Sequence, residues 1–263
     1  MEKKIDLMIK NNIATIKFMD PDNLNPLNKQ IAKELVEIFE DLREKNDVRC
    51  IILTGSGRAF SAGGDIKLFK SSIEDGTSGQ VMDDLTKDLY KIALFLRLYP
   101  KPIIAAVNGW AVGAGMNLAL SCDLIIASEK AKFRQSFCKL ALIPGFAGSI
   151  LLSRQLTWQQ ATQMAFFGDT MSAEDLEKLG LINKITTADK LDEIAMEYAK
   201  KLAKGPTLTY ARTKELFFDA LSTPLEEQLE KERQMQIKSA ETEDYKIGVF
   251  ALVDKKEPDF KGK

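Results

Sequence analysis

Apolar residues near the N-terminus fall into two short runs separated by a polar turn. The first run covers residues 5–9 and the second covers 13–18, with Lys10, Asn11 and Asn12 between them. Apolar residues that alternate or cluster on either side of such a turn are typical of paired strands. The pattern therefore predicts a β-hairpin.

A helix is predicted next, because the spacing of the apolar residues changes to three and four. These positions are Ile31, Leu35, Ile38 and Leu42. Residues three and four apart share one face of a helix, so this stripe would face a core while the charged residues face solvent. Asn28 is placed to cap the first turn, and the helix is expected to end near Lys45.

Three short, uncharged apolar runs follow at 50–54, 102–107 and 124–127. Runs of this length bounded by turn residues are typical of buried parallel strands. Between the last two lies a segment, 113–120, that begins with glycines and then continues as an apolar helix. Strand, helix and strand in this order predict an α/β fold with right-handed crossovers.

The polar segment that begins at residue 71 is expected to be a mobile connection, because it contains Ser71, Ser72, Gly76, Ser78 and Gly79. A helix should follow over 81–98. Connections of this kind often cover binding sites.

From residue 189 onward the pattern is helical, without strands. Leu191, Ile194, Tyr198 and Leu202 form one apolar stripe, which Gly205 and Pro206 end. Pro224 starts another helix. We therefore expect a core over 1–190 and a C-terminal helical region over 191–263.

Composition and charge exclude several classes of function. Lys plus Arg is 37 and Asp plus Glu is 38, a formal net charge of −1, which argues against a protein that neutralises nucleic-acid phosphates. Residues 102–122 carry no charge over 21 residues, the length of a membrane span, but asparagines and glycines interrupt them. Residues 1–10 are too charged for a signal sequence. No membrane partner is expected.

The chain contains three cysteines and no histidine. Cys50, Cys122 and Cys138 lie among apolar residues, which is typical of reduced thiols in a cytoplasmic protein. The absence of histidine excludes histidine-based catalysis and nearly every common zinc site, so no metal is expected. Carboxylates, amides, Cys, Lys, Tyr or the backbone must supply any chemistry.

Two turns that contain glycines could supply backbone chemistry, since each follows a buried strand and leads into a helix. They cover residues 59–67 and 108–117. Glycine lets a ligand approach the backbone closely, and a helix start presents free N–H groups, so two such amides could hold one oxyanion. Alternatively, the glycines only permit tight packing. Neither turn matches a phosphate loop or a dinucleotide-binding turn.

Here the sequence resembles a known family. The matching segments are Ala59-Phe-Ser-Ala-Gly-Gly-Asp-Ile-Lys67, Pro102-Ile-Ile-Ala-Ala-Val-Asn-Gly109, Gly113-Ala-Gly115, Ser121-Cys-Asp-Leu124, Ala131-Lys-Phe133, Leu142-Ile-Pro-Gly145, 172–182, 244–252 and 258–262. Their order and spacing are similar to those of the enoyl-CoA hydratase/isomerase (crotonase) superfamily over essentially the whole chain. The residues of the middle segments are most similar to those of the phenylacetate-pathway branch of enoyl-CoA isomerases.

The resemblance implies an α/β spiral of ββα units with a C-terminal helical trimerisation region, assembled as a trimer or a dimer of trimers. It also implies that the backbone N–H groups of Gly64 and Ala114 form an oxyanion hole for an acyl-CoA thioester, each worth about 3–4 kcal/mol in the transition state. Gly64, Asp65, Ile66 and Lys67 would contact the CoA portion. Coenzyme A would be part of the substrate, and no separate cofactor is expected.

The chain departs from the family pattern at the acid–base positions. Asn117 and Phe137 stand where hydratases of the superfamily have two glutamates, and Gly145 stands where the isomerase branch has an aspartate. Because Asn, Phe and Gly cannot exchange a proton as a carboxylate does, hydration is disfavoured and isomerisation is favoured.

Three functions stay open after this loss. The first is an isomerase that uses a carboxylate or another group from elsewhere, with Asp65, Asp123 and residues of the 71–90 segment as candidates. The second is a decarboxylase of a CoA or carrier-protein thioester, and the third is a subunit that only binds acyl-CoA. Asp65 and Asp123 are also suited to capping a helix or the end of a strand. Cys138 and Lys139 could react if their pKa were lowered, but they are also suited to being a core thiol and a surface lysine.

Overall fold

The computed structural model describes residues 3–263, and a six-stranded sheet forms its centre. Across this sheet the strands are β1 (Ile5–Lys10), β2 (Ile13–Phe18), β4 (Cys50–Gly55), β7 (Ile103–Val107), β9 (Leu124–Ser128) and β12 (Lys184–Thr186). The first two strands form the predicted antiparallel hairpin, and each later pair is parallel. Every residue of β4 and β7 is buried, as expected for parallel strands covered on both faces.

Shorter strands pair beside this sheet. A four-stranded sheet has the order β11 (Thr170–Ser172), β10 (Lys132–Arg134), β8 (Trp110–Val112) and β5 (Ala59–Ser61), and β3 (Pro26–Leu27) pairs with β6 (Gly63–Gly64). The helices are α1 (Lys29–Glu44), α2 (Ile66–Glu74), α3 (Ser78–Leu98), α4 (Ala114–Ser121), α5 (Gly148–Gln155), α6 (Trp158–Phe167), α7 (Ala173–Lys178), α8 (Leu191–Ala203), α9 (Thr207–Asp219), α10 (Leu225–Ala240) and α11 (Glu243–Val253). Short 3-10 turns occupy η1 (Pro21–Asn23), η2 (Ser136–Leu140) and η3 (Ala188–Lys190).

The chain visits the large sheet, then the small sheet, then a helix, and does so three times. The units are β4–β5–α2, β7–β8–α4 and β9–β10–α5. This repeat confirms the α/β spiral of ββα units that the resemblance predicts. It also places the turn after each short strand at the start of a helix.

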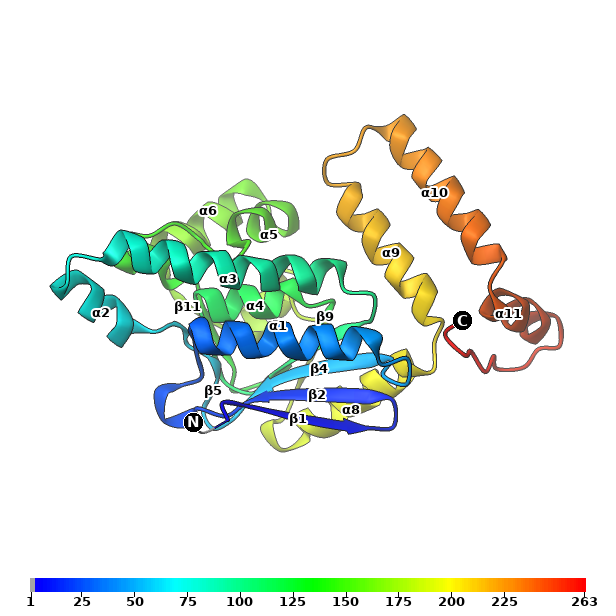
Figure 1. Ribbon diagram of the computed structural model, residues 1–263, viewed down its shortest axis with the longest axis horizontal. Coiled ribbons are helices and arrows are strands. Elements are labelled where there is room, and N and C mark those ends of the chain that lie inside the picture. The colour runs from blue at the N-terminus through cyan, green and yellow to red at the C-terminus, as the bar shows by residue number, and fades with distance from the viewer. Residues whose placement is uncertain (1–2) are drawn as a thin grey trace.

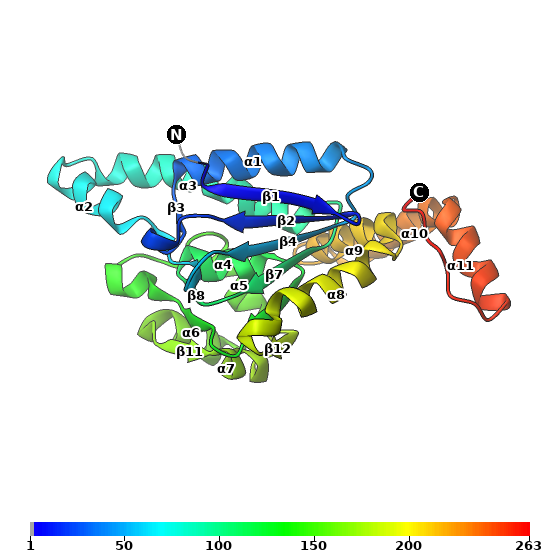
Figure 2. The ribbon, with the colours of Figure 1, turned by 90° about the horizontal axis from the view of Figure 1, so that it is seen from below.

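Helices cover both faces of the large sheet (Figure 2). On one face α1, α3 and α4 enclose the main apolar core, and on the other face α8 lies along the strands. Asn28 caps α1 as predicted, since its side-chain oxygen accepts from Ile31 N at 3.0 Å. These two layers fix the strand ends from which the site is built.

Helix α8 packs on the sheet through small residues rather than through the predicted stripe alone. Its buried residues are Leu191, Ala195, Ala199 and Ala203, while Ile194, Tyr198 and Leu202 are half-buried beside them. Small side chains let a helix approach a sheet closely. Because α8 packs on the sheet, the helices that extend away from the core begin with α9. The role of residues 191–263 in assembly stays a prediction.

The structure corrects the expected loop after residue 71. Residues 66–74 and 78–98 are helical, so only three residues connect α2 to α3. The serines suit this helix because Ser71 and Ser72 donate their hydroxyls to the Leu68 and Phe69 carbonyl oxygens, at 3.0 and 2.8 Å.

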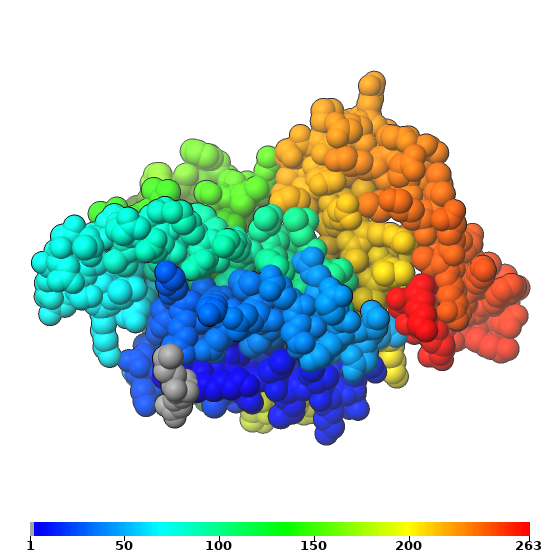
Figure 3. Space-filling model, in the orientation of Figure 1, coloured from blue at the N-terminus to red at the C-terminus, as the bar shows by residue number. Residues whose placement is uncertain are grey.

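Beyond the sheet, α9, α10 and α11 extend away from the core as an arm (Figures 1 and 3). The chain end folds back on it, because the buried Asp244 carboxylate accepts from Lys261 N and Gly262 N at 2.6 and 2.9 Å. Arg49 ties the same end to the core by donating to the Phe260 carbonyl oxygen at 2.8 Å. The matched segment 258–262 therefore holds the end of the chain against both the arm and the core.

Among the helices that the structure describes, none combines the length and apolarity needed to cross a bilayer. All three cysteines are free; Cys50 and Cys122 are buried and Cys138 is half-buried. The cytoplasmic location expected from them stays a prediction.

Candidate active site

The first turn of the site runs from β5 through β6 into α2. Gly63 has a φ of +81°, and a methyl carbon there would lie 2.5 Å from the Val112 carbonyl oxygen, so the turn requires glycine. Asp65 caps α2 by accepting from Lys67 N and Leu68 N at 3.0 and 3.3 Å. The side chain that follows Gly64 is thus used by the helix itself.

The second turn runs from β8 into α4 and packs directly on the first. Ala114 is the first residue of α4, so its N–H belongs to those without an acceptor inside the helix. The methyl position at Gly63 lies 3.1 Å from Ala114 N, and a methyl carbon on Gly115 would collide with the Ser61 carbonyl oxygen. The structure therefore brings the two predicted oxyanion donors onto adjoining segments. Their role in holding an oxyanion stays a prediction.

Asn117 is fully buried and committed to two partners. Its Nδ2 donates to the Gly145 carbonyl oxygen at 2.7 Å, and its Oδ1 accepts from Gln135 Nε2 at 2.6 Å. Gln135 is also fully buried, and its Oε1 has no partner among the described residues. The amide at 117 therefore anchors the turn at Gly145. The sequence analysis missed Gln135, which lies between the matched segments 131–133 and 142–145, next to Arg134 and Ser136.

Phe137, Gly145 and Tyr90 meet at one wall of the site. A methyl carbon on Gly145 would lie 3.2 Å from the Tyr90 hydroxyl oxygen and 3.5 Å from the Phe137 ring. The Phe137 ring also lies 3.7 Å from the methyl position on Gly113, next to Ala114. The wall beside Ala114 thus consists of the Phe137 ring, the Gly145 backbone and the Tyr90 phenol.

Comparisons with known proteins agree with this geometry. The family model for enoyl-CoA hydratase/isomerase matches residues 8–263. The chain is 33% identical to a 1,2-epoxyphenylacetyl-CoA isomerase of Escherichia coli K12, over 97% of each chain, and 36% identical to a probable mitochondrial enoyl-CoA hydratase of Dictyostelium discoideum, over 97% of this chain and 89% of that one. The crystal structure of an enoyl-CoA hydratase from Polaromonas sp. JS666 superposes with a TM-score of 0.93 at 29% identity and covers 97% of this chain and 99% of that one.

The chain belongs to the enoyl-CoA hydratase/isomerase family. This confirms the membership and the fold that the motifs predict. Relatives named as hydratases and relatives named as isomerases match about equally well, so the choice between these reactions rests on the site.

Two carboxylates that the sequence analysis names as candidate acid–base groups bind other parts of the protein. Asp65 caps α2, as described above. Asp123 accepts from Ile103 N and from Lys214 Nζ, both at 2.8 Å. Burial raises the pKa of Asp123, and the Lys214 charge opposes that rise. Both aspartates therefore hold local structure, and Lys139 is exposed on η2.

Other members of the predicted CoA-contact segment lie at the surface. Ile66 is 57% exposed, and the Lys67 ammonium donates to Asn23 Oδ1 at 2.9 Å. Both residues lie on the first turn of α2, after Asp65, and are exposed. Contact with CoA stays a prediction.

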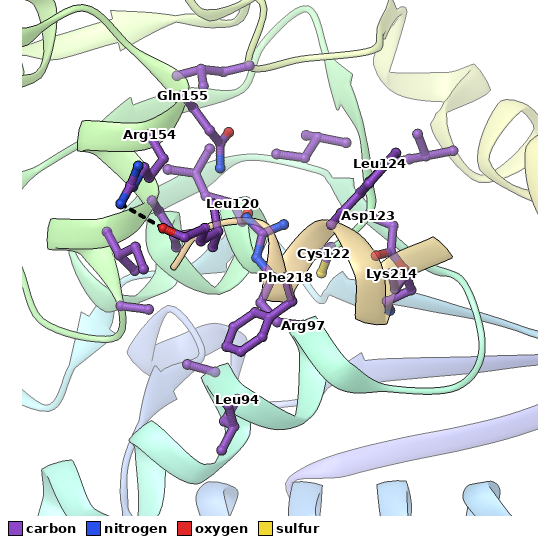
Figure 4. Close-up of a pocket in the computed structure, with 18 of the residues that line it drawn as sticks. Leu94, Arg97, Leu120, Cys122, Asp123, Leu124, Arg154, Gln155, Lys214 and Phe218 are labelled. Atoms are coloured by element: carbon purple, nitrogen blue, oxygen red, sulfur yellow. Dashed lines mark hydrogen bonds and ion pairs between the residues drawn. The ribbon is translucent and has the colours of Figure 1, made fainter. Parts of the chain in front are cut away.

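A cavity of about 980 Å³ is lined by residues of α3, α5 and α9 (Figure 4). Tyr90 and Gly145 belong to its lining, whereas Phe137, Gly64 and Ala114 do not. Tyr90, Gly145 and Ile143 line one end, and Lys214 and Phe218 of α9 line another. Its lining is mainly apolar, but it also includes Arg97, Arg154, Lys214 and Asp123. Arg154 closes part of the rim by donating to the Leu221 carbonyl oxygen at 3.0 Å. A cavity of this size accommodates a drug-sized or acyl ligand.

Proposed function

We propose that this protein isomerises the double bond of an unsaturated acyl-CoA thioester through an enolate held by the N–H groups of Gly64 and Ala114. The contact between the two glycine turns supports the proposal, because Ala114 N lies 3.1 Å from the methyl position on Gly63, the residue before Gly64. Removal of a proton next to a thioester places negative charge on the carbonyl oxygen, and preorganised N–H donors stabilise that charge. The names of the relatives support CoA thioesters as the substrate class.

The composition of the wall favours isomerisation over hydration. Addition of water needs a group that activates the water and a group that protonates the neighbouring carbon, and two carboxylates do this well. Here the two corresponding positions hold Asn117 and Phe137, and Asn117 is engaged with Gln135 and the backbone. A double-bond shift needs one group that moves a proton between two carbons of the same substrate.

The CoA portion would lie along residues 64–67, with the acyl group in the cavity between α3, α5 and α9. Ile66 offers an exposed apolar surface and Lys67 a cation at the start of α2. The cavity lining is mainly apolar, which suits an acyl chain.

Turnover of a substrate panel tests the reaction. Purified protein is incubated with 3-enoyl-, 2-enoyl-, oxepin- and malonyl-type CoA thioesters, and products are followed by mass spectrometry and NMR. Interconversion of 3-enoyl and 2-enoyl thioesters without net uptake of water is expected. Hydration or loss of CO2 as the main reaction, or tight binding without turnover, would contradict the proposal and favour a hydratase, a decarboxylase or a binding subunit.

The variant Ala114→Pro tests the oxyanion hole in the same assay. Proline lacks the N–H but is well accepted at the first position of a helix, so α4 should form. Loss of one donor should lower kcat by about 10²- to 10³-fold. A CoA thioether, which lacks the carbonyl oxygen, provides the control and should bind equally to both proteins. Equal turnover by the two proteins would exclude this role for Ala114.

We further propose that the arm mediates assembly into a trimer or a dimer of trimers. Helices α10 and α11 each have a single buried residue, Gln228 and Asp244, whereas Phe250, Leu252 and Val253 are 68, 81 and 74% exposed. Apolar side chains gathered at a surface in this way are typical of protein interfaces.

A further inference from the structure

Tyr90 is the polar side chain of the wall formed by Phe137, Gly145 and Tyr90, and it is exposed to the cavity. Its side chain is 47% exposed on α3, and it lines the same cavity as Gly145. By contrast, Tyr99, which directly follows the last residue of this helix, is fully buried, and its hydroxyl donates to the Phe39 carbonyl oxygen at 2.6 Å. Tyr90 therefore presents a phenol to the cavity rather than to the core.

The position of the Tyr90 hydroxyl coincides with the gap left by the missing carboxylate. Its oxygen lies 3.2 Å from the point where a side chain at position 145 would begin. The Phe137 ring lies 3.5 Å from that same point and, on its other edge, 3.7 Å from the methyl position on Gly113. Phe137 thus lies between position 145, which the phenol faces, and the turn that leads into α4.

We propose that the Tyr90 hydroxyl is the acid–base group of this site and moves the proton during isomerisation. This inference rests on the proposed function. The other candidates do not serve. Asp65 and Asp123 hold local structure, and Asn117 has no ionisable proton. The carboxylates of the 71–90 segment are not among the residues that line the cavity.

The step balances without any further reactant. The Tyr90 oxygen takes a proton from C2 of a 3-enoyl thioester as its own hydroxyl proton passes to C4. The C2–H electron pair becomes the double bond between C2 and C3, and the electron pair of the C3–C4 double bond forms the new C4–H bond. The two N–H groups hold the negative charge that develops on the carbonyl oxygen, and Tyr90 ends with one proton, as it began.

Tyr90→Phe removes only the hydroxyl and keeps the ring. It should lower kcat for the double-bond shift by at least about 100-fold, the usual contribution of general acid–base catalysis, with KM and the thermal midpoint unchanged. Tyr198→Phe makes the same chemical change on α8, on the other side of the sheet, and should leave kcat unchanged. A Tyr90→Phe protein that keeps more than about one third of the wild-type kcat would overturn the proposal.

Restoring a carboxylate provides a second readout. Gly145→Asp in the Tyr90→Phe background places a carboxylate at the same space, and loss of the hydroxyl removes the atom only 3.2 Å from the new side chain. The double variant should recover at least about 10-fold of the lost kcat. No recovery, in a protein that folds and binds the thioether, would count against the placement of the group.

Deuterium uptake at C2 of a saturated acyl-CoA in D2O separates this inference from the proposed function, because exchange needs the base and the oxyanion hole but no double bond. Exchange by the wild type and not by Tyr90→Phe supports Tyr90, even if no enoyl thioester is isomerised. Equal exchange by both proteins rejects Tyr90 alone. No exchange and no isomerisation by the wild type reject both proposals.

Discussion

Two of the three thiols are held in the protonated form by their surroundings. Burial raises the pKa of Cys50 to about 12 and raises that of Cys122 as well, and in each case the Asp123 charge adds to the rise. Because the thiolate is the reactive form, both side chains should be inert at ordinary pH. Cys138 is half-buried on η2.

We therefore expect at most one thiol of the native protein to react with a disulfide reagent at pH 8, and three in denaturant. Cys138→Ser should abolish the native reaction. Peptide mapping that places the label on Cys50 or Cys122 in the native protein would contradict this expectation.

The same shifts predict how stability depends on pH. Unfolded thiols ionise near pH 8.5, whereas the folded protein holds these protons to higher pH. The folded state thus binds more protons in this window, so the free energy of unfolding should fall as the pH rises from about 8.5 toward 12.

At the scale of elements, one lysine joins α9 to the sheet. The Lys214 ammonium donates to Asp123 Oδ2 at 2.8 Å and to the Leu96 carbonyl oxygen at 3.0 Å, and its side chain is only 12% exposed. These contacts link the first helix of the arm to the end of α3 and the start of β9. They also fix one end of the large cavity.

Lys214→Met should leave the half-buried Asp123 carboxylate without its nearest counter-charge. Breaking a fully buried pair costs about 3–5 kcal/mol, so a smaller loss of unfolding free energy is expected here, which denaturant titration can measure. Lys201→Met, an exposed change on α8, is the control and should have little effect. Adding Asp123→Asn to Lys214→Met should recover part of the loss, and a single variant as stable as the wild type would disprove the coupling.

At the scale of the whole molecule, the arm carries much of the exposed apolar surface and little core of its own. Sedimentation of the wild type should show a trimer or a hexamer at micromolar concentration. Phe250→Asp, on the exposed face of α11, should shift the protein toward the monomer without unfolding the core.

Met8→Asp is the matched control for this assembly test, because Met8 is 59% exposed on β1, away from the arm. It should leave the oligomeric state unchanged. A monomeric wild type, or equal effects of both variants, would show that the arm has another role.

The sequence by itself determined the elements and the family. The hairpin, the cap at Asn28 and the buried strands depend on residues that are neighbours in the chain, so their periodicity and turn residues are enough to predict them. The glycine turns were found for the same reason, since a positive φ or a close approach demands glycine in any fold. The loop expected after residue 71 was wrong, because serines can bond to the preceding turn of a helix.

Only the tertiary structure decided which side chains face the site. Asn117 and Gly145 are 28 residues apart in sequence, and their contact depends on how the turn after η2 packs on α4. Tyr90 comes from a third element, and its hydroxyl reaches position 145 only because α3 lies across the same cavity. Such contacts follow from the packing of distant elements, which no local pattern encodes. The sequence therefore predicted that position 145 lacks a carboxylate, and only the fold placed the Tyr90 hydroxyl beside that position.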